Sequence, residues 1–176
     1  MYKSNKNIVP KIHSDSEYIF RYNCDKNNLD IVKWLNDIFL DIDIHVWDEY
    51  ALCNACEYGY YDMVNYLLDR YHDIDIHVLN DKPFRFACKS GNLDIVKLLL
   101  NLAPDIDIMV SNPNAFECAL IKGHLDVAKY LKTHYPDIDH TKYIKYPTKY
   151  NRDIKKWLED GCPCDFNSRR IKSARK

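Results

Sequence analysis

Apolar side chains along the chain follow two spacings, one typical of helices and one typical of extended segments. In residues 50–58 and again in 62–70 they stand three and four positions apart, which predicts two amphipathic helices. The next segment, "DIDIH" at 73–77, alternates isoleucine with polar residues, and this period of two favours an extended finger. The predicted order is inner helix, turn, outer helix and finger.

This pattern returns at a fixed step along the chain. The aspartates that open the fingers are each 32 positions after the one before (73 − 41, 105 − 73 and 137 − 105), and they are Asp41, Asp73, Asp105 and Asp137. The outer helices keep the same step at Asp30, Asp62, Asp94 and Asp126. A fixed step of this length is typical of a solenoid, in which stacked units share one core because no unit has enough apolar surface to fold alone.

The turn between the two helices of each unit carries a further repeated residue. Gly59, Gly91 and Gly123 stand in register, and Asn27 takes the equivalent place in the first unit. Glycine and, less freely, asparagine adopt the positive φ that ends a helix. Small Ala-Cys pairs in the inner helices, such as the one at 55–56, predict close approach between neighbouring units. We therefore expect an all-α fold of stacked helix-turn-helix units.

One stretch carries a resemblance to a known family. The segment "PFRFACKSGNLDIVKLLLNLAPDIDI" at 83–108 resembles the ankyrin repeat. The residues that match its signature are Pro83, Ala87, Gly91, Asp94, Val96, Lys97, Leu98, Leu99, Leu100 and Asp105. The resemblance implies an ankyrin-repeat solenoid with extended finger loops, and a non-catalytic role in which the concave face of the stack binds other proteins.

The resemblance also suggests a domain organisation. We expect an N-terminal extension at 1–13, a repeat domain at 14–165 and a basic flexible tail at 166–176. The expected units are about 14–45, 46–77, 78–109 and 110–141, followed by an irregular unit at 142–165. Polar Asn23 stands where later units have alanine, so the first unit is expected to be a cap. Pro147 predicts a short or distorted inner helix in the last unit.

Carried over position by position, the ankyrin resemblance implies a set of partner-binding residues. They are Trp47, Glu49, Glu57, Tyr58, Leu79, Asp81, Lys89, Ser90, Ser111, Asn114, Ile121 and Lys122. Aromatic side chains are frequent energetic centres of protein interfaces, so Trp47 and Tyr58 are the expected anchors. The alternative, in which Trp47 only packs on the next finger, stays open at this point.

Composition limits the class of protein. The chain has 176 residues, 47% hydrophobic and 29% charged, which is typical of one ordered domain. We find no apolar signal segment and no stretch near the roughly 20 apolar residues of a membrane span. The odd count of 7 cysteines indicates reduced thiols. The expectation is a protein of the cytoplasm, with the nucleus as a second possibility, that is monomeric alone and does not bind membranes.

The candidate metal-binding and catalytic residues in the sequence do not point to an enzyme. The Asp and His of "DIDIH" suggest a divalent cation, but copies at a fixed step are what repeat geometry produces. Cys24, Cys56 and Cys88 fall in one inner-helix column and are expected to be core residues, as are Cys162 and Cys164. Nucleotide-binding and zinc-protease motifs are absent. We therefore expect no catalytic residues, no cofactor, no metal and no small-molecule substrate.

Charge and composition leave two further hypotheses. Residues 141–176 carry eleven Lys/Arg against four Asp/Glu, and Lys/Arg alternate with Tyr there, which suggests nucleic-acid association or nuclear targeting as the alternative function. The abundance of Tyr, Asn, Ile and Lys and the repeated fingers resemble divergent ankyrin proteins of giant DNA viruses of amoebae. A viral protein that engages a host protein is the hypothesis that this resemblance adds.

Overall fold

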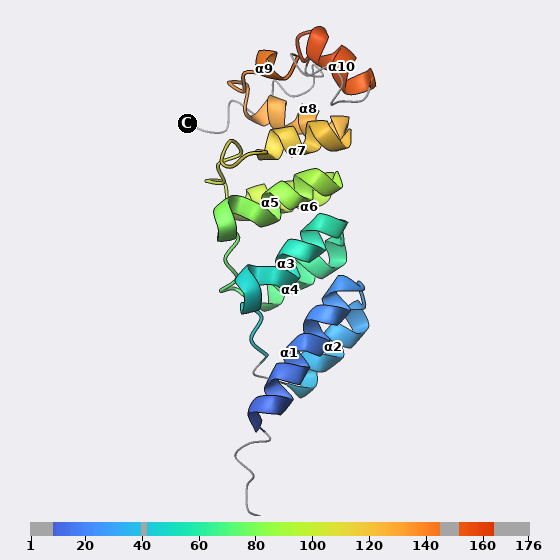
Figure 1. The fold of residues 1–176 in the computed structure, drawn as a ribbon, viewed down its shortest axis with the longest axis vertical. Coiled ribbons are helices and arrows are strands. Elements are labelled where there is room, and N and C mark those ends of the chain that lie inside the picture. The colour runs from blue at the N-terminus through green and yellow to red at the C-terminus, as the bar shows by residue number, and fades with distance from the viewer. Residues whose placement is uncertain (1–8, 40–41, 145–151, 164–176) are drawn as a thin grey trace, which may run out of the picture.

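The computed structural model describes residues 9–39, 42–144 and 152–163, with only the backbone for 9–16, and the regular structure in these ranges is helical. In chain order the helices are α1 (Val9–Asp25), α2 (Leu29–Ile38), α3 (Val46–Tyr58), α4 (Tyr61–Arg70), α5 (Val78–Ser90), α6 (Leu93–Leu102), α7 (Ala115–Lys122), α8 (Leu125–His134), α9 (Thr141–Ile144) and α10 (Arg152–Glu159). Consecutive helices form pairs, and Figure 1 shows the pairs stacked along one axis from α1 and α2 to α9 and α10. The predicted all-α solenoid is confirmed.

Inner helices form the main seam of the stack. Helix α3 packs on α5 and α5 packs on α7, whereas the outer helices α4, α6 and α8 contact each other less. The Ala-Cys pairs at 55–56 and 87–88 are fully buried in this seam. Their small side chains let neighbouring helix axes approach, as the sequence predicts.

The following unit contacts the turns between inner and outer helix at Gly59 and Gly91. Gly59 and Gly91 end their helices with φ of 73° and 79°, and Asn27 takes φ of 56° in the first unit, so the predicted left-handed caps are confirmed. The Asn92 side-chain amide donates to the Gly59 carbonyl over 3.0 Å. A Cβ added to Gly91 would lie 2.3 Å from Nδ1 of His124, so this position has no room for a side chain.

The core follows the predicted periodicity. Phe84 and Phe116 of the inner helices and Met63 and Leu67 of an outer helix are fully buried. Burial of each such side chain stabilises the fold by about 1.5–3 kcal/mol. In the third finger, at 105–109, the two isoleucines are buried and the two aspartates exposed, which confirms the alternation.

The two ends of the stack depart from the regular units. At the C-terminal end α9 has 4 described residues, and Pro147 lies outside the described ranges, so the short or distorted inner helix of the last unit stays a prediction. Helix α1 begins at Val9, within the stretch expected to be an extension. Asn23 is buried there and bonded on both sides, to the Ile19 carbonyl at 2.8 Å and to the Asn28 side chain at 2.9 Å. The predicted tail at 166–176 lies outside the described ranges.

Candidate protein-binding surface

Two left-handed turns begin the inner helices of the second and third units. Residues 47–49 have φ of 59°, 56° and 55°, and residues 79–81 have φ of 51°, 58° and 56°. None of these residues is glycine. The left-handed conformation costs roughly 1–2 kcal/mol for each such residue, so other contacts must hold the two turns in place.

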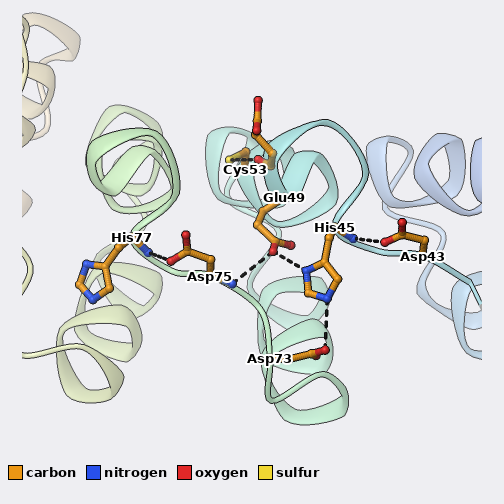
Figure 2. Close-up of polar contacts among 8 residues, drawn as sticks. Asp43, His45, Glu49, Cys53, Asp73, Asp75 and His77 are labelled. Carbon is orange, nitrogen blue, oxygen red and sulfur yellow. Dashed lines mark hydrogen bonds and ion pairs between the residues drawn. The ribbon is translucent and has the colours of Figure 1, made fainter.

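A buried carboxylate holds the first left-handed turn. Glu49 is 5% exposed, and its Oε1 lies 2.6 Å from Nδ1 of His45 and accepts a hydrogen bond from the Asp75 backbone N–H over 3.2 Å. The other ring nitrogen of His45 lies 3.2 Å from Oδ2 of Asp73. Figure 2 shows the imidazole between these carboxylates, with Asp73 and Asp75 contributed by the next finger. The turn is therefore fixed to the following unit.

The second left-handed turn repeats this network with an aspartate. Asp81 is 6% exposed, its Oδ1 lies 2.6 Å from Nδ1 of His77, and its Oδ2 accepts from the Asp107 N–H over 3.2 Å. Nε2 of His77 lies 3.5 Å from Asp105. We call each set of contacts a histidine–carboxylate bridge. The hydrogen bond to Glu49 or Asp81 raises the pKa of His45 or His77, while partial desolvation opposes the rise.

The bridges explain the repeated "DIDIH" segments. Among the described residues no group of three or more His, Cys, Asp and Glu side chains is arranged to hold a metal ion. The acids and the histidine instead bond to one another and to backbone N–H groups of the fingers, as for Asp43, which accepts from the His45 N–H over 2.9 Å. Their chemistry joins one unit to the next.

Each left-handed turn projects a large apolar side chain while it buries its acid. Trp47 is 67% exposed, and the Arg21 guanidinium of the first unit lies 4.3 Å from its ring centroid. Tyr50 meets the same ring edge to face at 5.8 Å. Leu79 takes the equivalent place in the next unit and is also exposed. Trp47 thus packs under Arg21 and still offers most of its surface to solvent.

The fourth unit, 110–141, fills the same place differently. Ser111 has a positive φ of 73° and is half-buried, and Asn114 is a buried N-cap that accepts from the Glu117 N–H over 2.8 Å. The Asn114 side chain donates to the Tyr143 hydroxyl over 3.0 Å. Met109 stands where the earlier fingers have histidine. This unit has no histidine–carboxylate bridge within the described residues.

The remaining predicted residues lie at the opposite ends of the inner helices. Lys89 donates to Glu57 over 2.6 Å, which joins α5 to α3. Tyr58 is exposed and stacks on Tyr60 with ring centroids 5.6 Å apart. Ser90 donates to the Ala87 carbonyl, Ile121 is half-buried and Lys122 is exposed. The twelve residues therefore form two surface groups, and the side chains of Glu49, Asp81 and Asn114 point inside the protein.

Sequence reasoning missed the partners that shape this surface. His45 and Glu49 are four residues apart, as are His77 and Asp81, and the spacing recurs at the 32-residue step. This spacing could have predicted that each histidine pairs with its acid. Arg21 carried no such signal, because its contact with Trp47 joins two consecutive units and does not recur at the 32-residue step.

The buried cysteines offer no reactive group to this surface. Burial raises the pKa of the Cys24 thiol to about 12 and places the pKa of Cys56 and Cys88 well above the ordinary value. A thiol is nucleophilic and binds metals as the thiolate, so these groups are inert at neutral pH. Cys162 is buried and Cys164 lies outside the described residues.

Comparison with known proteins agrees with this architecture. A family model described as ankyrin repeats (3 copies) matches residues 72–142, and a model of the single ankyrin repeat matches residues 47–81. A search of curated proteins gives no significant match. None of the helices in the described ranges has the length and apolar content needed to cross a bilayer. The two family matches together run from residue 47 to residue 142, more than half of the chain, and the chain belongs to the ankyrin-repeat family.

Proposed function

We propose that the protein is a non-catalytic module that binds another protein through its fingers and inner helices. Ankyrin repeats generally mediate protein–protein interaction, and proteins built from them are typically non-catalytic. The observation that carries the proposal is the pair of left-handed turns. Each turn buries a carboxylate that is bonded to the next finger, and each presents a large apolar side chain to solvent.

Backbone strain of this kind supports a binding role. Residues in rarely populated backbone regions are concentrated at binding and catalytic sites, where surrounding contacts enforce them. Here the enforcing contacts are the histidine–carboxylate bridges, so Trp47 and Leu79 project from a backbone fixed by the next unit. A surface that is ordered before docking loses little conformational entropy when a partner binds.

The proposed binding residues fall into the two surface groups. The first group projects from the fingers and consists of Trp47, Leu79 and Ser111. The second lies at the far ends of the inner helices and consists of Glu57, Tyr58, Lys89, Ser90, Ile121 and Lys122. Glu57 and Lys89 neutralise each other, so Tyr58 is the energetic anchor that we assign to the second group. Trp47 is the anchor of the first.

A finer proposal concerns the class of partner. The compositional resemblance to ankyrin proteins of giant viruses makes a host protein, met in the cytoplasm, the partner that we name. The alternative function through the basic C-terminal region rests mainly on residues 145–151 and 164–176, which lie outside the described ranges. It stays a prediction from the sequence.

The test compares partners captured by the wild-type chain and by a variant with Trp47→Ala, Leu79→Ala and Tyr58→Ala. Quantitative mass spectrometry after affinity capture should show a discrete set of proteins that the variant loses. Leu102→Ala is the matched control, because Leu102 is an exposed leucine of the outer helix α6 and belongs to neither group. Equal capture by all three chains, at equal helical circular dichroism, would remove the proposed surface.

A further inference from the structure

The first unit exposes apolar side chains that its successors bury. Ile31 of α2 is 43% exposed, whereas the residues at the same position in the three following outer helices, Met63, Ile95 and Val127, are fully buried. Ile19 of α1 is likewise exposed, and its counterparts Ala51 and Ala115 are buried. We call the surface of Tyr18, Ile19, Tyr22, Ile31 and Trp34 the end face.

Contacts inside the stack show which way the outer-helix residues of the end face point. Tyr66 is the counterpart of Trp34 one unit later, and its hydroxyl accepts from the Asn36 side chain over 2.7 Å, with the Lys33 ammonium 5.7 Å from its ring. Tyr130, in the same column, lies 5.9 Å from the ammonium of Lys97. Asn36, Lys33 and Lys97 each belong to the preceding unit. This column therefore faces the preceding unit, and Trp34 is 58% exposed because no described residue precedes it there.

Residues of the inner helices also face the preceding unit. Tyr50 and Asn54, the counterparts of Tyr18 and Tyr22, both donate to the Asp25 carboxylate of the preceding unit, over 3.2 Å and 2.7 Å. Tyr18 and Tyr22 therefore belong to columns that cover the unit before them, and both are exposed. The end face is thus a stacking face, and it continues the interface that joins every pair of units in the solenoid.

The opposite end of the stack differs in chemistry. The exposed residues of α10 are charged: Arg152, Asp153, Lys155, Lys156 and Glu159. Terminal repeats need a polar outer surface for solubility. The exposed residues of α10 are all charged, whereas α1 and α2 expose the apolar and aromatic residues of the end face beside their charged ones. An end-to-tail contact between copies would place the charges of α10 on the apolar end face and would cost their hydration.

From this asymmetry we propose that the end face docks a second copy of this chain through the same face, as a twofold dimer. An isologous contact needs only one self-complementary patch, and twofold dimers are the commonest soluble oligomers. Apolar cores are typical of homodimer interfaces. Two end faces pressed together would bury Ile19, Ile31 and Trp34 against each other's apolar side chains, whereas their counterparts within the stack are covered by the preceding unit. The inference revises the sequence-based expectation of a monomer and does not depend on the proposed function.

The first experiment is sedimentation equilibrium of the purified full chain from about 1 to 300 μM. The wild-type chain should dimerise, and Trp34→Glu and Ile31→Lys, tested separately, should each weaken dimerisation about tenfold or more, as expected for a residue at an interface centre. Leu102→Glu is the control, because it places the same charge on an exposed leucine far from the end face. Circular dichroism must show that each variant keeps the wild-type helix content.

A second variant gives the geometry of the contact. Trp34→Cys should form a disulfide-linked dimer under mild oxidation when the twofold axis passes near residue 34, because only residues near the axis meet their own copies. The described native cysteines are buried and should not compete. The proposal is overturned if the wild-type chain stays monomeric over the whole concentration range. It is also overturned if Trp34→Glu, Ile31→Lys and Leu102→Glu weaken dimerisation equally. A monomer that binds more apolar dye after deletion of residues 1–8 would make the chain's own N-terminus the occupant.

Discussion

Ionisable groups join the second and third fingers to the left-handed turns before them, whereas neutral groups join the fourth unit to α9. Glu49 and Asp81 each accept a backbone N–H of the next finger and contact a histidine. In the unit after them, Asn114 caps its own helix and donates to Tyr143. In the fourth unit Pro113 takes the position of Glu49 and Asp81, and Asn114 caps the helix instead; among the described residues only the charged version holds a left-handed turn of three residues.

Removal of a bridging acid should have the largest effect on stability, and it tests the difference between the charged and the neutral contacts. Asp81→Ala leaves the Asp107 N–H and the His77 ring without their partner, and it releases the left-handed turn. We expect a loss of about 3 kcal/mol in the free energy of unfolding. Asn114→Ala, at the neutral site, should cost about 1–2 kcal/mol, mainly through the lost N-cap. Urea unfolding of both variants at pH 7 measures the difference, and equal losses would contradict a special role for the charged bridge.

A smaller effect concerns pH. The pKa of His45 and His77 is raised in the folded state, so the stability contributed by their protonated forms is full below the unfolded pKa of about 6.5 and is lost as pH rises through the folded pKa. Asp73 has a lowered pKa because His45 bonds to it, so its contribution is lost in acid. The bridges should therefore be strongest between about pH 5 and 6.5.

The matched variant for this prediction is His45→Gln with His77→Gln. The urea midpoint of the wild-type chain should fall between pH 6 and 8.5 by the equivalent of a few tenths of a kcal/mol for each exposed histidine. The double variant should show a flatter profile over this range. An identical slope in both chains would place the pH dependence in the other histidines.

The smallest effect is expected from an attempt to copy half of a bridge into the third finger. Met109→His restores the histidine, but Pro113 stands where the acid should be. We expect a change of stability within about 0.5 kcal/mol and no added pH dependence between pH 6 and 8.5. A new fall in stability with rising pH would show that the histidine alone suffices, and the comparison between the fingers would then fail.

The sequence predicted the parts of the fold that depend on local backbone preferences and on periodic burial. The positive φ of Gly59 and Asn27 followed from residue type and register, and the buried stripe of Met63 and Leu67 followed from spacing. These features are local, so one unit of sequence contains the information that they need.

The candidate surface was only partly predictable. Glu49 and Asp81 were expected on the surface because the ankyrin resemblance implies it, yet both are buried by contacts with fingers 26 residues ahead. The left-handed turns contain no glycine, which is the residue whose presence would have predicted a positive φ. The first unit was expected to be a cap because of Asn23, but Asn23 is satisfied internally, and the exposed residues are Ile31 and Trp34. Long-range contacts determine whether these side chains are buried or exposed, and the sequence pattern of one unit does not contain this information.

Trp47, Leu79 and Ser111 occupy the same position in three successive units, so they are spaced regularly along the stack. Packed helices lie about 8–10 Å apart, so successive fingers present these side chains at about that interval. An extended peptide advances about 3.3 Å for each residue. A partner segment that lies along the fingers would therefore meet a new finger about every third residue, with a tryptophan, a leucine and a serine as its three successive contacts.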